Sequence, residues 1–207
     1  MRKIALAIAC MAIFILPAAS MKPGKRPVLG VEWASGLTFH TFHTYNYLRA
    51  DGTRIQGSDH QFITNLNASI LFKGGYDLGT RWNISVITGY EGINDRFRII
   101  PLGTRGTYFF GNGQNKDGSF IFIEPGTALF SSADNWVFYV RLGFGKRFEL
   151  SPATVFDISL FYRLTHSCPE LVDPDEEIVD RLFSNNILTG YLGINMSLNF
   201  QYSLFKR

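Results

Sequence analysis

The sequence contains few of the features that stabilise soluble secreted domains or helical membrane proteins. Charged residues make up only 18% of the chain, whereas about 25% is typical of soluble domains. Beyond residues 1–20, no run approaches the roughly 18 consecutive apolar residues that indicate a transmembrane helix. The formal net charge is +3 and no basic cluster is present. We therefore predict neither a helical membrane protein nor a nucleic-acid partner.

Cysteine is also scarce, and the familiar motifs of cofactor chemistry are missing. One of the two cysteines, Cys10, lies in a segment that we expect to be removed, which leaves Cys168 without an intrachain partner. The sequence has no CxxC pair, phosphate-binding loop or nucleophile elbow. His40 and His43 are three positions apart, which places them on opposite faces of a strand, a poor spacing for a metal site. We therefore expect no disulfide, no cofactor and no metal.

The first 20 residues are typical of a secretory signal peptide. The basic start "MRK" precedes the apolar run "IALAIACMAIFILP", and the small residues "AAS" end the segment. An uncleaved anchor is the alternative, although the run is short for a helix that must span a bilayer with about 20 residues. We predict two parts, the signal peptide (1–20) and one β-barrel domain (21–207).

The remaining chain is dominated by a period of two residues. In the closing stretch "GINMSLNFQYSLFKR", one alternating set is apolar and the other consists of Asn, Ser and Gln. Similar alternation recurs and predicts strands. They lie near Val28–His43, Gln61–Lys73, Arg81–Glu91, Arg98–Phe110, Ser119–Phe130, Asn135–Phe148, Thr154–His166 and from Asn186 onward. This pattern predicts an all-β fold, an eight-stranded antiparallel up-and-down transmembrane β-barrel.

The predicted connections differ in length. Long loops are expected at Tyr45–His60 and Ser167–Asn185, and the best helix candidate is a turn or two within Asp175–Phe183. Outer-membrane barrels have short turns at one end and longer loops at the other.

The composition of the two strand faces indicates which one meets lipid. One face is rich in Phe, Trp, Tyr and Leu, and the other in small polar residues with isolated charges. An eight-stranded interior is just wide enough for side chains to fill, so we assign the polar set to a filled interior and the apolar set to lipid. The charges would then form a paired interior network, since unpaired buried charge is costly. The network comprises Glu32, Glu91, Glu124, Asp157, Arg105, Arg141 and Arg163, with Arg147 and Lys73 in the same phase. A soluble barrel with a hydrophobic ligand and a narrow channel remain as alternatives.

Several aromatic residues are candidates for the girdles that flank the apolar band of such barrels. They are Trp33, Trp82, Trp136, Tyr90 and Tyr202. The alternative is that they are ordinary strand aromatics.

The signal segment, the eight alternating strands and the ending "NFQYSLF" resemble the small outer-membrane β-barrel proteins of Gram-negative bacteria, which include the transmembrane domain of the OmpA type. The resemblance implies an outer-membrane location, with lipid and lipopolysaccharide as surroundings. It also implies a last strand, carrying Phe200, Tyr202 and Leu204, that the barrel assembly machinery reads. We expect a monomer with a structural or surface-interaction role.

One stretch, "YRLTHSCPE", suggests an enzymatic alternative. Some eight-stranded outer-membrane barrels are lipid A deacylases, and this chain resembles them in carrying His166 near the end of the seventh strand. In those enzymes His activates Ser for attack on an acyl ester. Here Ser167 is adjacent to His166 and would point the opposite way, and Cys168 stands two positions along. A triad would therefore need a bulge, a changed nucleophile and an acid from the loop.

Overall fold

The computed structural model describes residues 25–48, 52–62, 65–93, 98–111, 117–131, 136–168 and 179–201. The predicted signal peptide lies outside these residues. The described residues form nine β-strands and, within them, no helix is both long and apolar enough to cross a membrane. The strands are β1 (Lys25–Leu48), β2 (Arg54–Gln61), β3 (Asn65–Leu78), β4 (Trp82–Gly92), β5 (Arg98–Phe109), β6 (Gly118–Ser131), β7 (Val137–Ser151), β8 (Thr154–Ser167) and β9 (Val179–Gln201).

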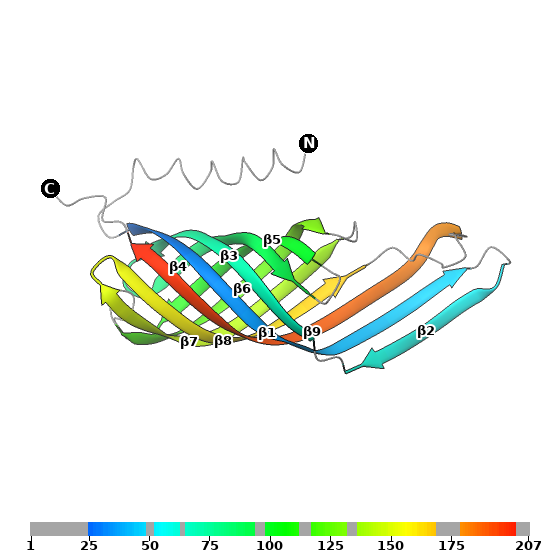
Figure 1. Ribbon diagram of the computed structural model, residues 1–207. Helices are drawn as coiled ribbons and strands as arrows, with labels where there is room; N and C mark the ends of the chain where they lie inside the picture. Colours follow the sequence, from blue (N-terminus) through cyan, green and yellow to red (C-terminus); the bar gives the residue numbers. More distant parts are fainter. Residues whose placement is uncertain are drawn as a thin grey trace.

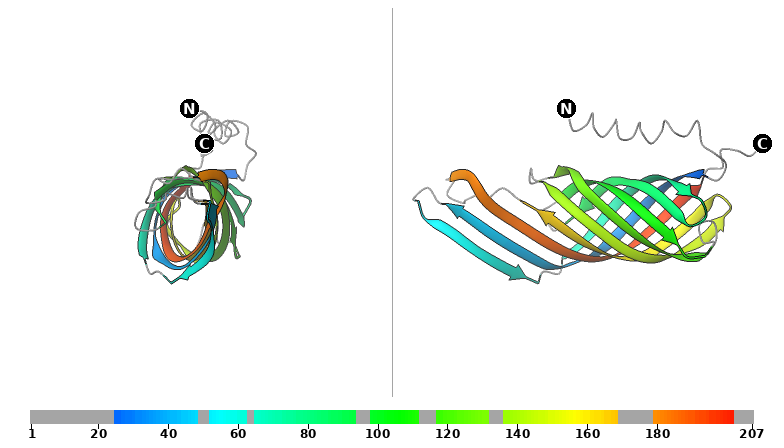
Figure 2. Two further views of the ribbon diagram at one scale, coloured as in Figure 1. Left: turned by 90° about the vertical axis from the view of Figure 1, so that its right-hand side faces the viewer. Right: turned by 180° about the vertical axis from the view of Figure 1, so that it is seen from behind.

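Eight of these strands close into an antiparallel barrel. Strands β3 to β9 follow one another in sequence order, and β1 pairs with both β3 and β9. Seen end-on, the strands form a ring (Figure 2, left). Closure satisfies the backbone hydrogen bonds between neighbouring strands, as a bilayer demands. The predicted eight-stranded antiparallel up-and-down barrel is confirmed.

The prediction of a long first loop at Tyr45–His60 is wrong. Strand β1 continues to Leu48, and β2 returns beside it from Arg54, with Tyr47 opposite Ile55. Gly52, shortly before β2, has φ of 83°, a conformation that glycine adopts without strain. In the sequence Gly52 follows an aspartate. An Asp-Gly pair between alternating stretches is a hairpin signal that the sequence interpretation overlooked.

The hairpin forms part of an extension that projects beyond the barrel wall (Figure 1). We define this extension as residues 41–48 of β1, all of β2 and residues 179–187 of β9. Strand β1 lies in the middle, paired with β2 on one side and β9 on the other. The expected last loop is therefore also too long, because β9 begins at Val179 and the helix expected within Asp175–Phe183 is strand from that residue onward.

A β-bulge lies where β1 leaves the barrel. Thr38 is opposite Tyr191 of β9, but His40 is opposite the next residue, Gly190, so Phe39 is the extra residue. A bulge changes which face the following side chains occupy. Regular alternation over Val28–His43 predicts His40 on the polar face, in phase with Glu32 and Thr38. The bulge instead places it beside Phe42, with ring centroids 4.3 Å apart.

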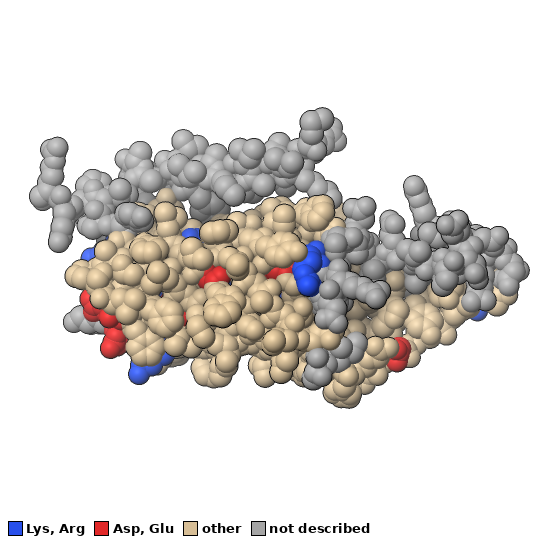
Figure 3. All heavy atoms as spheres, viewed as in Figure 1, with Lys and Arg blue, Asp and Glu red and all other residues tan. Residues whose placement is uncertain are grey.

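The outer wall of the barrel is apolar. Along β7, Phe138, Val140, Leu142 and Phe144 are about half exposed, whereas the residues between them are more enclosed. Charged side chains are few and isolated on the face seen in Figure 3. Such a surface is far larger than the apolar patches that soluble monomers tolerate, and it is the surface of a protein that lies in lipid.

Candidate functional site

The inside of the barrel holds a continuous chain of ion pairs. It contains three carboxylates and three guanidinium groups, and each side chain is no more than about 4% exposed. Because buried charges are costly when unpaired, these groups need partners inside the barrel. Along the chain of contacts the residues are Glu32, Arg105, Glu124, Arg141, Glu91 and Arg163.

Arg105 joins two carboxylates. Its Nη1 and Nη2 donate to the two oxygens of Glu32 at 2.5 and 2.9 Å. Its Nε and Nη2 donate to Glu124 Oε2 at 2.8 and 2.6 Å. Asn195 adds a hydrogen bond to Glu32 at 3.2 Å. The planar fork of arginine suits such bidentate contacts.

The other half of the chain centres on Glu91. Arg141 Nη2 donates to Glu91 Oε1 at 2.6 Å, and Arg163 forms an ion pair with the same oxygen. Arg141 Nη1 also lies 3.6 Å from Glu124 Oε1. Ser69 donates to Glu91 at 3.2 Å.

These contacts cross the lumen from wall to wall. Glu91 is on β4 and Arg163 on β8, and three strands separate them in either direction around the barrel. Glu32 on β1 and Arg105 on β5 are almost as far apart around the ring. The ion pairs thus connect strands on opposite sides of the lumen.

Asp157, the remaining acid predicted for this network, belongs to a separate pair. Arg147 donates from Nε and Nη2 to its two oxygens, both at 2.7 Å. Asn199 adds a hydrogen bond at 3.0 Å. Lys73 is buried at 5% exposure, as its phase on the strand suggested.

Buried aromatic rings accompany the arginines, and the sequence interpretation missed them. The guanidinium carbon lies 4.3–4.7 Å from a ring centroid in four cases, within the range of a cation–π contact. The pairs are Arg105 with Phe122, Arg141 with Phe161, Arg147 with Phe109, and Arg163 with Tyr191. Each of these rings shares the strand phase of polar or charged inner-face residues, which is the signal that could have revealed it.

Tyr139 hydrogen-bonds to the ion-pair chain, and its ring packs against two glycines. Its hydroxyl donates to Glu124 at 3.1 Å. Gly103, Gly126 and Tyr139 lie opposite one another on three adjacent strands. A Cβ on Gly126 would lie only 2.3 Å from the tyrosine Cζ, so the ring requires glycine beneath it.

Further polar and apolar contacts lie at the end of the barrel from which the extension projects. Thr38 Oγ1 and Asn67 Nδ2 both donate to the carbonyl oxygen of Ile93, each at 2.9 Å. Ile93 packs with Ile99 and Val137 in a buried apolar cluster.

The residues of the enzymatic alternative do not form a catalytic arrangement. His166 lies on the exposed side of β8, whereas Ser167 is buried at 8% exposure on the inner side. The thiol of Cys168 donates to Asn186 Oδ1 at 3.2 Å. Since the histidine and the serine occupy opposite faces, His166 cannot activate Ser167 in this structure.

The aromatic girdle candidates occupy different levels of the wall. Trp82 contacts Tyr108 at 4.9 Å between centroids, beside the turn at Gly79–Arg81. Tyr90 lies near the C-terminal end of β4, and Trp136 directly precedes β7. Both side chains are more than half exposed. Trp33 lies within the wall, opposite Ile70 and Met196. Tyr202 is outside the described residues.

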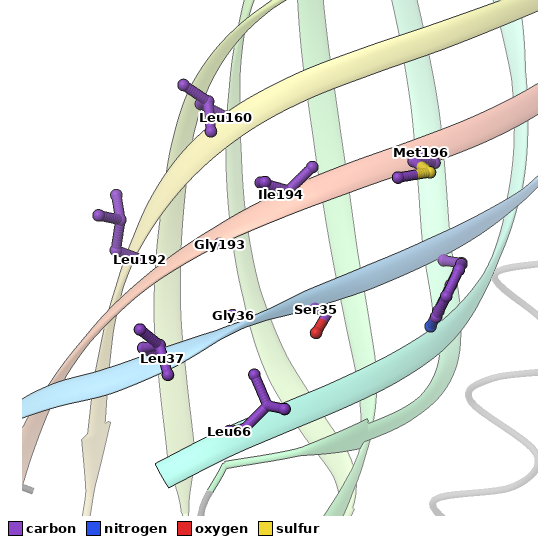
Figure 4. Close-up of a pocket in the computed structure, with 10 residues that line it drawn as sticks. Ser35, Gly36, Leu37, Leu66, Leu160, Leu192, Gly193, Ile194 and Met196 are labelled. Carbon is purple, nitrogen blue, oxygen red and sulfur yellow. The ribbon is translucent and has the colours of Figure 1, made fainter. Parts of the chain in front are cut away.

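A groove of about 410 Å³ marks the outer wall where β1 meets β9. Figure 4 shows the small Ser35 side chain among larger ones from three further strands, including Leu66, Leu160 and Ile194. None of the described residues that line the groove is titratable. The groove thus lacks an acid or a base for chemistry.

Comparison with known proteins supports the architecture alone. No protein-family model and no curated protein matches this sequence. The crystal structure of the outer membrane protein OprG from Pseudomonas aeruginosa aligns with a TM-score of 0.53 at 9% identity, over 86% of this chain and 96% of that chain. Neisserial surface protein A (NspA) aligns with a TM-score of 0.34 at 11% identity, over 81% of this chain and 95% of that chain. The shared fold is that of a small outer-membrane β-barrel.

Proposed function

We propose, from the premise that this chain has the fold of an eight-stranded outer-membrane β-barrel, that it is a non-conducting barrel of the bacterial outer membrane with a structural or surface-interaction role. Its outer wall would contact outer-membrane lipid and lipopolysaccharide, and the barrel assembly machinery would insert it as a monomer. The usual orientation of such barrels places short turns in the periplasm. The extension would then stand on the outer side.

The ion pairs that cross the lumen are the observation that carries this proposal. Opposite walls are linked through Glu91 and Arg163, and through Glu32 and Arg105. A permeating ion would have to displace these side chains, and a broken buried pair leaves an uncompensated charge at a cost of about 3–5 kcal/mol. This arrangement favours a plug over a pore.

The extension supports a role in surface interaction. Its residues include Tyr45 and Tyr47, whose rings lie 6.2 Å apart, beside Asn46 and Gly57. Tyrosine provides rigid contact area, while Asn, Ser and Gly provide adaptable hydrogen bonds, a combination that is common in binding surfaces. The extension lies beyond the wall and so is free to meet a partner.

Conductance across planar lipid bilayers tests the proposal. We expect the purified mature chain, inserted and shown to be folded by a heat-dependent shift on a gel, to produce no discrete current steps. The variant Glu91→Ala/Arg163→Ala removes one bridge across the lumen and serves as the comparison. Regular current steps from the wild-type chain would contradict a plugged barrel.

A further inference from the structure

Two histidines meet on the outer side of the molecule, where the extension joins the barrel. His60 Nε2 lies 2.9 Å from His40 Nδ1, and this contact is exposed. His60 is on β2, opposite Phe42 of β1, and His40 is two residues before Phe42. The bulge at Phe39 and the hairpin together create this juxtaposition, which is why the sequence interpretation found no metal site.

Aromatic side chains hold both imidazole rings in place. Phe42 stacks on His60 with centroids 4.2 Å apart and planes 9° from parallel. The Phe42 ring also meets His40 edge-on at 4.3 Å. Phe62 lies 4.8 Å from His60 and 5.9 Å from His40. Rings fixed in this way lose little entropy when their nitrogen atoms bind a ligand.

We propose that His40 and His60 form a surface site for a divalent transition-metal ion of the Cu²⁺ and Ni²⁺ class. Imidazole nitrogens bind such ions at about 2.0–2.1 Å. Two ligands at right angles around one ion are then about 2.9 Å apart, and square-planar or tetragonal geometry is typical of Cu²⁺ and Ni²⁺. The observed separation of 2.9 Å between the two nitrogens fits that arrangement.

Replacement of the hydrogen bond between the two rings by a metal ion requires no net release of a proton. In the metal-free pair, one ring donates its N–H to the other. When the ion binds, the donor ring moves that proton to its other nitrogen, so that both facing nitrogens present lone pairs. Within the described part of the chain, no three His, Cys, Asp or Glu side chains gather around one point, so water completes the coordination.

The surroundings leave the pair accessible to water. Where the extension joins the barrel, the outer face is apolar at Phe42 and Leu188, which are opposite each other. It turns polar one step further at Thr44, opposite Ser58 and Asn186. The pair therefore lies at the boundary between the apolar wall and the polar surface. His166 is on β8 in the same row, opposite Leu188, and offers a control site.

Titration with Cu²⁺, followed by electron paramagnetic resonance, tests this site in the full mature chain purified in detergent without a histidine tag. We expect one bound ion with hyperfine splitting from two nitrogens. His40→Ala and His60→Ala should each weaken binding at least tenfold and leave one nitrogen, since loss of a ligand's supporting partner alone costs about 10- to 100-fold in affinity.

Matched variants separate this site from other histidines and from misfolding. His166→Ala and His43→Ala should bind Cu²⁺ as the wild type does, because His43 faces Asn185 on the other side of the extension. The heat-dependent gel shift should remain in every variant. Absence of Cu²⁺ binding by the wild type, undiminished binding by His40→Ala/His60→Ala, or an equal loss in the controls would overturn the proposal.

Discussion

At the scale of single residues, Arg105 joins two buried carboxylates and one aromatic ring of the interior. It hydrogen-bonds to both Glu32 and Glu124 while its guanidinium stacks on Phe122. We expect Arg105→Met to lower the free energy of unfolding by about 3–5 kcal/mol, because two buried carboxylates lose their shared partner. Urea unfolding in detergent, followed by tryptophan fluorescence, measures this change.

The same experiment has an internal control. Glu32→Gln/Arg105→Met/Glu124→Gln removes the buried charges together with their partner, and it should recover much of the lost stability. If Arg105→Met alone costs no more than an ordinary surface substitution, the ion pairs do not stabilise the barrel.

Gly126 is the second residue whose identity has a clear physical reason. A methyl group there would overlap the Tyr139 ring, displacing the hydroxyl that donates to Glu124. Gly126→Ala should cost about 1–3 kcal/mol of unfolding free energy, as overpacking does elsewhere. Gly106→Ala is the control, since the nearest atom to its new Cβ would be 4.0 Å away. Equal effects of the two substitutions in the same urea titration would contradict this role for Gly126.

At the scale of the strand, β7 presents one face to lipid and one to the lumen. Leu142 lies midway along it and is half exposed. We expect Leu142→Arg to destabilise the barrel in lipid vesicles by about 2–4 kcal/mol, because a charge there lies near the middle of the bilayer. Thr44→Arg, on the extension beyond the wall, should cost only about 0–1 kcal/mol. A soluble barrel would tolerate both changes equally well.

The strand scale is also where sequence reasoning succeeded and failed. In β8, Phe156 to Leu164 alternate strictly, and the period of two determines which side chains face outward once one is assigned. Around Phe39 the same reasoning fails, since the bulge depends on how β1 aligns with Gly190 of β9, which lies far away in the sequence. The stretch before Asp51 was interpreted as loop because its alternating residues are Tyr, Asn and Thr, which lack a continuous apolar face.

The interior could be predicted only in part, for a related reason. Strand phase identified Glu32, Arg105 and Glu91 as neighbours in the lumen, but phase says nothing about which charges pair across it. Those contacts depend on the stagger of opposite strands. The stacked rings, such as Phe122 and Phe161, were overlooked because apolar residues on the inner face conflicted with the expectation of a small, polar filling.

At the scale of the whole molecule, we expect the barrel to fold without the tip of the extension. Residues 45–57 can be replaced by Asn-Gly, which forms a two-residue hairpin turn, because Thr44 is opposite Ser58. We expect this variant to keep its heat-dependent gel shift and a urea midpoint close to that of the wild type. Loss of the folded form on the gel would instead mean that the extension is needed for barrel formation.

The ion pairs of the lumen constrain the order in which the strands can associate during folding. Glu32 is contributed by the first strand, and its ionic partner is contributed by one from the far wall. Sheet formation between neighbours in sequence cannot bring these two together; only curling of the sheet into a ring does so. Neutralisation of Glu32 is thus a late event, and it favours the final pairing of the two edges of the sheet over any flat intermediate.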